Sequence, residues 1–113
     1  MHELSIAMSL VEAACREARA NGAHSVRRVQ VVLGALSGIE PDALCFCFPI
    51  AAQETLCAAA ELELRVVPAS GRCQHCGQHS DVTDLLAPCP ACGSWPLVVE
   101  GGREMLLESL EVA

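Results

Sequence analysis

The amino-acid sequence predicts an α+β fold, with two helices on a small three-stranded antiparallel sheet and a cysteine-rich module inserted between two strands. Three observations lead to this prediction. Apolar residues recur at helical spacing in two segments, and they alternate with polar residues in three others. Residues 70–101 differ from both, with paired cysteines, Gly, Pro and His. We therefore expect one domain of residues 1–69 and 102–113, and a second domain of residues 70–101 inserted into it.

The first helix is expected from Leu4 to about Ala20. Its apolar residues are spaced by three and four positions, which places on one face Leu4, Met8, Val11, Cys15 and Ala18. The dipeptide Asn21-Gly22 that follows is a typical helix stop.

The second helix is expected to start in "IEPDAL". Pro41 suits the first helical turn, and Asp42 suits the positive end of the helix dipole. The residues expected to face the core are Leu44, Phe48 and Ala51 or Ala52. Pro49 should kink or end this helix, because a proline in a helix interior costs about 3 kcal/mol.

Three segments read as strands, at residues 25–34, 61–67 and 103–112. Each alternates apolar with polar residues, as a half-buried strand does. The apolar faces should carry Val29, Val31 and Leu33 in the first strand, Leu62, Leu64 and Val66 in the second, and Leu106, Leu110 and Val112 in the third, where Glu108 breaks the pattern.

The composition limits the function. The chain of 113 residues is 52% hydrophobic and has a net charge of -7, with no lysine. A phosphate-binding surface needs positive charge, so nucleic acid is not an expected partner. No apolar run is long enough to span a membrane and no secretory signal is visible, so we expect a cytoplasmic protein.

The stretch "CQHCGQHSDVTDLLAPCPACG" indicates a metal site. Two CxxC turns are separated by twelve residues and supply four thiolates, from Cys73, Cys76, Cys89 and Cys92. Four thiolates in a tetrahedron suit Zn(II) in a closed structural site. Iron in a rubredoxin-like centre is the main alternative, and a pair of disulfides is a lesser one. His75 and His79 lie beside the motif and are expected to be solvated or to support the ligands.

Four further cysteines lie outside the module. They are expected to fill the core as small apolar side chains, and they are Cys15, Cys45, Cys47 and Cys57.

The N-terminus "MHE" offers a second metal site. The amine of Met1, the backbone amide of His2 and its imidazole can close two fused chelate rings, and Glu3 can add a fourth donor. A plane of nitrogen donors favours Ni(II) or Cu(II) over tetrahedral Zn(II). This chemistry requires that nothing precedes Met1. The alternative is a frayed terminus with a solvated His2.

The whole chain resembles the HypA/HybF family of hydrogenase maturation factors. The resemblance rests on "MHELSIAMSLVE", on "VVLGALSGIEPDAL", and on the double CxxC stretch followed by "SLEV". It implies an α+β nickel domain with an inserted zinc domain. Nickel would be bound around His2 and Glu3, and zinc by the four cysteines of the two CxxC motifs. Pro49, Cys45 and Cys47 depart from the pattern expected for the second helix.

The resemblance also implies a function and partners. The protein would be a metallochaperone rather than an enzyme, loading Ni(II) into the large subunit precursor of [NiFe] hydrogenase together with the GTPase HypB. Some family members also serve urease. A monomer or a homodimer is expected. The alternatives from other classes are a zinc-ribbon interaction module and an iron electron carrier.

Overall fold

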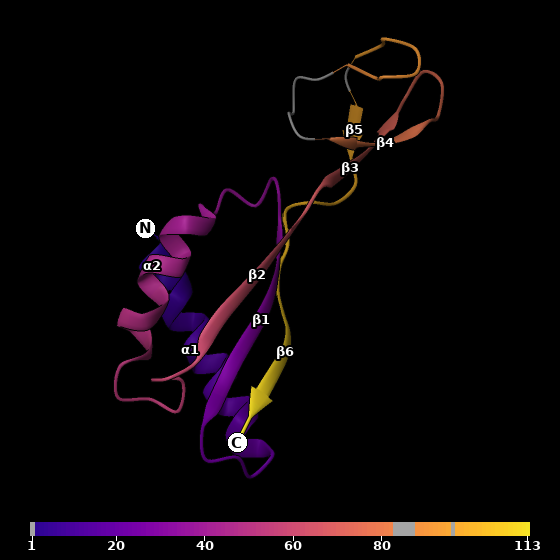
Figure 1. The fold of residues 1–113 in the computed structure, drawn as a ribbon. Coiled ribbons are helices and arrows are strands. Elements are labelled where there is room, and N and C mark those ends of the chain that lie inside the picture. The colour runs from indigo at the N-terminus through magenta and orange to yellow at the C-terminus, as the bar shows by residue number, and fades with distance from the viewer. Residues whose placement is uncertain (1, 83–87, 96) are drawn as a thin grey trace. The chain divides into compact units, whose positions relative to one another are not determined.

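The computed structural model describes residues 2–82, 88–95 and 97–113 (Figure 1). The elements, in chain order, are α1 (Glu3–Ala20), β1 (Val26–Gly34), α2 (Pro41–Ala52), β2 (Glu61–Val67), β3 (Ala69–Cys73), β4 (His79–Val82), β5 (Leu97–Val99) and β6 (Met105–Val112). The chain divides into two compact units. The first comprises Met1–Val32, Ile39–Arg65 and Leu106–Ala113, and the second comprises Leu33–Gly38 and Val66–Met105.

The first unit contains both helices and most of the sheet β2-β1-β6, whose residues 33–34, 66–67 and 105 belong to the second unit. The helices α1 and α2 pack against each other, and β1 is the central strand of the sheet. Its core consists of buried residues from α1, β1, α2 and the turn after α2. The largest of those less than 2% exposed are Phe48, Leu44, Val26, Val29 and Val31. Neither helix in the described part of the chain is long and apolar enough to cross a membrane.

Helix α1 begins one residue earlier than predicted, and its buried face is rotated. Leu4 and Met8 are 45% and 54% exposed, so their assignment to the core is wrong. The buried face is instead made of Ala7, Leu10, Val11, Ala14, Cys15 and Ala18. Leu4 and Met8 therefore lie beside the buried face, in which Leu10 is the one long side chain among small ones.

Helix α2 starts as predicted and continues past Pro49. The Glu40 side chain accepts a hydrogen bond from the Asp42 amide at 3.2 Å, which caps the helix just before Pro41. Leu44, Phe48 and Ala52 are buried as predicted. The helix does not stop at Pro49. The one helical bond that Pro49 cannot make would go to the Cys45 carbonyl, and both residues are on the exposed side, where water can bind that carbonyl.

Strands β1, β2 and β6 lie where the sequence predicts strands, but their alternation fails toward the ends, and β3, β4 and β5 were not predicted. Val66, Leu106 and Val112 are 49%, 56% and 41% exposed, so their predicted inward orientation is wrong. In β6 the adjacent Glu108 and Ser109 both reach partners in the sheet, Glu108 on Arg65 and Ser109 on Gln30. Two neighbouring residues with partners on one face interrupt the alternation that the prediction assumed.

The second unit contains the antiparallel sheet β4-β3-β5. The register pairs Ala69 with Val82 and Cys73 with Leu97. Strand β3 begins only one residue after β2 ends, although the sequence suggested a boundary there. The unit also includes residues 33–38, whose Ala35 amide donates to the Val67 carbonyl at 2.8 Å. The predicted fold class, two helices on a small antiparallel sheet with an inserted double-CxxC module, is confirmed.

Candidate metal centre

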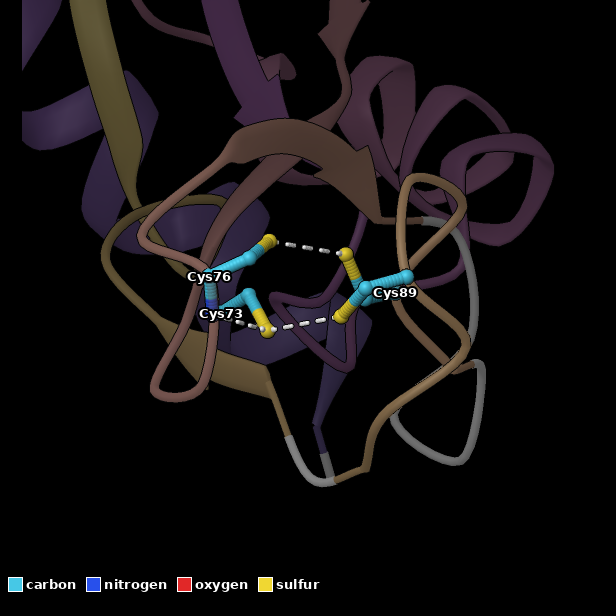
Figure 2. A group of neighbouring side chains, drawn as sticks. Cys73, Cys76 and Cys89 are labelled. Carbon is cyan, nitrogen blue, oxygen red and sulfur yellow. Dashed lines mark hydrogen bonds between the residues drawn. The ribbon is translucent and has the colours of Figure 1, made fainter.

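The four cysteines of the two CxxC motifs come together in the second unit (Figure 2). All four Sγ atoms lie within 4.8 Å of one another. The Sγ atoms of Cys73 and Cys92 are 3.6 Å apart, and those of Cys76 and Cys89 are 3.7 Å apart. A tetrahedral ion with metal–sulfur bonds of about 2.3 Å requires sulfur–sulfur separations of about 3.8 Å. The sulfurs are therefore already placed for one tetrahedral ion.

Both CxxC turns are closed by the same backbone bond. The Gly77 amide donates to the Cys73 carbonyl at 2.9 Å, and the Gly93 amide donates to the Cys89 carbonyl at 2.8 Å. Both glycines have left-handed backbones, with φ of 78° and 76°. Only glycine adopts this conformation without steric cost, which explains the residue that follows each CxxC pair.

The first turn directs backbone N–H groups at a sulfur. The amides of His75 and Cys76 each donate to the Cys73 Sγ at 3.4 Å. The Cys76 amide is the largest cause that lowers the pKa of the Cys73 thiol below its usual value. Donors aimed at a sulfur stabilise its thiolate form, which is the form that binds a metal.

The other thiols of the group cannot all ionise without a cation. Hydrogen bonds from the side chain and amide of Ser94 lower the pKa of Cys92 to about 6. The Gln78 amide acts in the same direction on Cys76, yet burial and hydrogen bonds to the three neighbouring sulfurs raise the Cys76 pKa to about 12. A divalent cation at the centre removes this conflict, because it favours the thiolate at every ligand.

Neither histidine beside the motif belongs to the cluster of metal-binding side chains found among the described residues. His79 Nε2 lies 3.1 Å from Glu100 Oε1, and Arg72 Nε lies 3.2 Å from the other oxygen of Glu100. This exposed group joins β3 and β4 to the residue after β5. The His75 side chain is exposed, and its residue contributes a backbone amide to the site.

The remaining cysteines divide into two kinds. Cys15 and Cys57 are buried, as predicted. Cys45 is exposed and Cys47 is only half-buried, so the prediction that all four fill the core is wrong. The reason is helical geometry, because the buried positions of α2 are Leu44, Phe48 and Ala52 and the residue after Leu44 faces outward.

His2 occupies the residue just before α1. Its backbone has φ of -163° and ψ of -36°, and its carbonyl accepts the Ile6 amide at 3.0 Å. The side chain is exposed and makes no capping hydrogen bond to the helix. Met1, the other predicted ligand, lies outside the described residues.

Glu3 is held against the start of the second helix. Its Oε2 accepts a hydrogen bond from the Glu40 amide at 3.3 Å. Because the Glu40 side chain in turn accepts the Asp42 amide, the carboxylates of Glu3 and Glu40 both lie at the starts of α1 and α2. Glu40 was not among the predicted site residues. A glutamate directly before a helix-starting proline is a recognisable capping position, but nothing in the sequence connects it to Glu3.

The comparison with known proteins identifies the family. The family model described as "Hydrogenase/urease nickel incorporation, metallochaperone, hypA" matches residues 1–112. The chain belongs to the HypA family. It is 44% identical over 112 residues to the hydrogenase maturation factor HypA of Chlorobium limicola, covering 99% of this chain and 97% of the relative. It is 40% identical to HypA of Geobacter metallireducens, covering 99% of each chain.

Two solved structures of HypA proteins share the fold. The solution structure of the Ni metallochaperone HypA from Helicobacter pylori is 30% identical, with a TM-score of 0.70 over 99% of this chain and 97% of that one. A second solution structure of a HypA protein is 29% identical, with a TM-score of 0.72 over 100% and 97% of the two chains. The family resemblance that the sequence indicated is confirmed, and with it a place in hydrogenase maturation.

Proposed function

We propose that this HypA chain carries Ni(II) at its N-terminus and delivers it to the precursor of the [NiFe] hydrogenase large subunit. The ligands are the Met1 amine, the His2 backbone amide and imidazole, and a donor from Glu3. The observation that carries the proposal is the position of His2, whose exposed imidazole stands directly before α1 and is not used to cap it. An exposed imidazole that does not cap the helix is available to a cargo ion.

The surrounding charges support a cation at this end of the first unit. The carboxylates of Glu3 and Glu40 lie at the two helix starts, and the Glu40 amide fixes the orientation of the Glu3 carboxylate. A nitrogen-rich donor set beside carboxylates suits Ni(II) better than it suits a soft thiolate-seeking ion. An exposed site also lets the ion leave, which delivery requires.

The four-thiolate site of Cys73, Cys76, Cys89 and Cys92 is proposed to hold a permanent Zn(II). Its sulfur separations suit Zn(II), and four protein ligands leave no open position, as in structural zinc sites. Rubredoxin-like iron has the same geometry, so metal analysis must separate the two. A colourless protein with one zinc per chain supports the proposal, and a coloured protein with one iron per chain contradicts it.

The remaining assignments follow from this role. The first unit is the nickel-binding part and the second the zinc-binding part of a cytoplasmic metallochaperone without an enzymatic activity of its own. Its partners are the GTPase HypB and the hydrogenase large subunit precursor, and it acts as a monomer or a homodimer.

Ni(II) titration of untagged, zinc-loaded protein tests the nickel site. His2→Ala should abolish high-affinity Ni(II) binding, while His24→Ala, which alters another exposed histidine of the same unit, should leave it unchanged. One extra residue ahead of Met1 should act like His2→Ala, because it displaces the amine from the chelate ring. Zinc content and the circular dichroism spectrum should be the same in all variants. Equal nickel affinity in His2→Ala and wild type would refute the proposal.

A further inference from the structure

Two thiols outside the metal centre are in contact inside the first unit. The Sγ atoms of Cys15 and Cys57 are 3.8 Å apart, and the two residues are 3% and 0% exposed. They come from α1 and from the turn after α2, 42 positions apart in the sequence. A disulfide bond has a sulfur–sulfur distance of about 2.05 Å, so the two sulfurs need to move only about 1.8 Å closer to bond.

The two sulfurs differ in how a small molecule can reach them. Cys15 lines an open groove of about 260 Å³, together with Met8 and Arg19 of α1 and residues 51, 54 and 55 from the end of α2 and the turn that follows. Cys57 does not line this groove. An oxidant that enters the groove therefore meets Cys15 before Cys57.

Hydrogen bonds in the turn after α2 hold Cys57 in place. The Cys57 amide donates to Thr55 Oγ1 at 3.0 Å, and the Thr55 hydroxyl donates to the Ala52 carbonyl at 2.7 Å. Burial, the hydrogen bond to Cys15 and charge on Cys15 together raise the pKa of the Cys57 thiol to about 12, with burial the largest cause. Cys57 therefore keeps its proton until its neighbour has reacted.

We propose that Cys15 and Cys57 form a site of thiol oxidation, at which a hydroperoxide converts the buried dithiol into a disulfide. The Cys15 thiolate attacks one peroxide oxygen, so that an S–O bond forms, the O–O bond breaks and the leaving oxygen departs as water. The sulfur of Cys57 then attacks the Cys15 sulfenic acid, an S–S bond forms, and the S–O oxygen leaves as a second water with the Cys57 proton. Two thiols are oxidised and one hydrogen peroxide is reduced to two waters.

The bond would join α1 to the turn after α2. Helix α1 carries His2 and Glu3 at its start, so this disulfide would restrain the helix that presents the proposed nickel ligands. The oxidation itself does not depend on nickel binding, and the two proposals are tested separately.

Cleavage of the chain after its arginines puts the cysteines into different peptides, which allows a direct test. Cleavage after arginine places Cys15 in residues 1–16, Cys57 in residues 29–65, and all four thiolates of the metal centre in residues 73–103. Full-length zinc-loaded protein is treated with a limiting amount of hydrogen peroxide and cleaved without reduction. We expect the first two peptides to appear joined, lighter by two hydrogens than their sum, while residues 73–103 stay reduced and zinc stays bound. Fragmentation of the joined peptides assigns the bond to Cys57 even if a variant fails to fold.

Variants identify the second partner independently. Cys15→Ala and Cys57→Ala should each abolish the joined product, whereas the double variant Cys45→Ala/Cys47→Ala, which removes the other two thiols of the same peptide, should keep it. Oxidised wild type should also melt roughly 10 °C or more above reduced wild type, because the bond closes a long loop. The proposal is wrong if the product disappears in the Cys45→Ala/Cys47→Ala variant, or if peroxide oxidises residues 73–103 and leaves Cys15 and Cys57 as thiols.

Discussion

Removal of the metal from the four-thiolate site should unfold strands β3, β4 and β5 and leave the helical unit folded. Among the described residues of these strands, the fully buried carbon side chains are only Ala69 and Val82, and the other buried residues are Gly71, which has no side chain, and the ligand Cys73. Complete burial of a valine contributes about 1.5–3 kcal/mol, whereas ordering one residue costs about 1–2 kcal/mol. A structural zinc site contributes an apparent 10–16 kcal/mol or so. Without the metal, the free energy of folding these strands is therefore unfavourable.

Hydrogen exchange with mass spectrometry measures this effect. The amides that pair β3 with β4, from Ala69↔Val82 to Arg72↔His79, should lose essentially all protection when a strong chelator removes the ion. The amides of α1 and β1 should keep theirs, because their core is made of buried apolar residues of the first unit. Full protection of β3 in protein shown by elemental analysis to be metal-free would refute the reasoning.

A pair of serine variants separates the ligand role from the general effect of losing a thiol. Cys92 and Cys45 are both exposed, so burial does not distinguish them. Cys92→Ser should reduce metal content and exchange protection in β3–β5, and Cys45→Ser should change neither.

Two further predictions concern pH and the apolar core. Metal affinity should fall at least tenfold per pH unit on acidification, since binding displaces the proton of Cys76, and the fall should steepen below about pH 6, where Cys92 also gains a proton. Ser94→Ala removes the main cause of the low Cys92 pKa, so the variant should release its metal at a higher pH than wild type. A chromogenic chelator can follow the release. An unchanged release curve would contradict the role of Ser94. Phe48→Ala should destabilise the protein by about 3–5 kcal/mol in urea unfolding, because Phe48 is 1% exposed. Phe46→Ala, at 74% exposure, should change stability by less than about 0.5 kcal/mol, and similar losses for both would show that α2 packs differently.

The thiolate site could be predicted from the sequence because its chemistry is local. Each CxxC turn fixes two sulfurs through its own backbone and a following glycine, and only the meeting of the two turns depends on the rest of the fold. The pairing of Cys15 with Cys57 could not be predicted in this way. It depends on the packing of α1 beside the turn after α2, and neither residue lies near the other in the sequence.

The errors in burial have a physical cause as well. A spacing of three and four residues defines a stripe along a helix. It does not fix the rotation of the helix about its axis, so a stripe shifted by one residue can face the core instead. In α1 the stripe that contains Leu4 and Met8 and the stripe that contains Ala7 and Ala14 fit the same periodicity. Close packing places the alanines in the core, whereas hydrophobicity alone would place the larger Leu4 and Met8 there. Likewise, the contact between Glu3 and the Glu40 amide joins residues 37 positions apart, which no local pattern encodes.

The geometry of the thiolate site also explains how one chain could handle two metals without mixing them. A square-planar ion with metal–sulfur bonds of about 2.3 Å would require neighbouring sulfurs about 3.3 Å apart and opposite ones about 4.6 Å apart. The separations of 3.6 Å between Cys73 and Cys92 and 3.7 Å between Cys76 and Cys89 match neither value and lie near the edge length of a tetrahedron. Both separations are between the two turns, so a planar Ni(II) ion would require the turns to meet in a different arrangement. The proposed N-terminal ligands have no such restraint on the His2 side chain. The fixed thiolate site would then select the tetrahedral ion, and the unrestrained N-terminal site would accept Ni(II). The cargo ion would be excluded from the thiolate site, from which it could not be released.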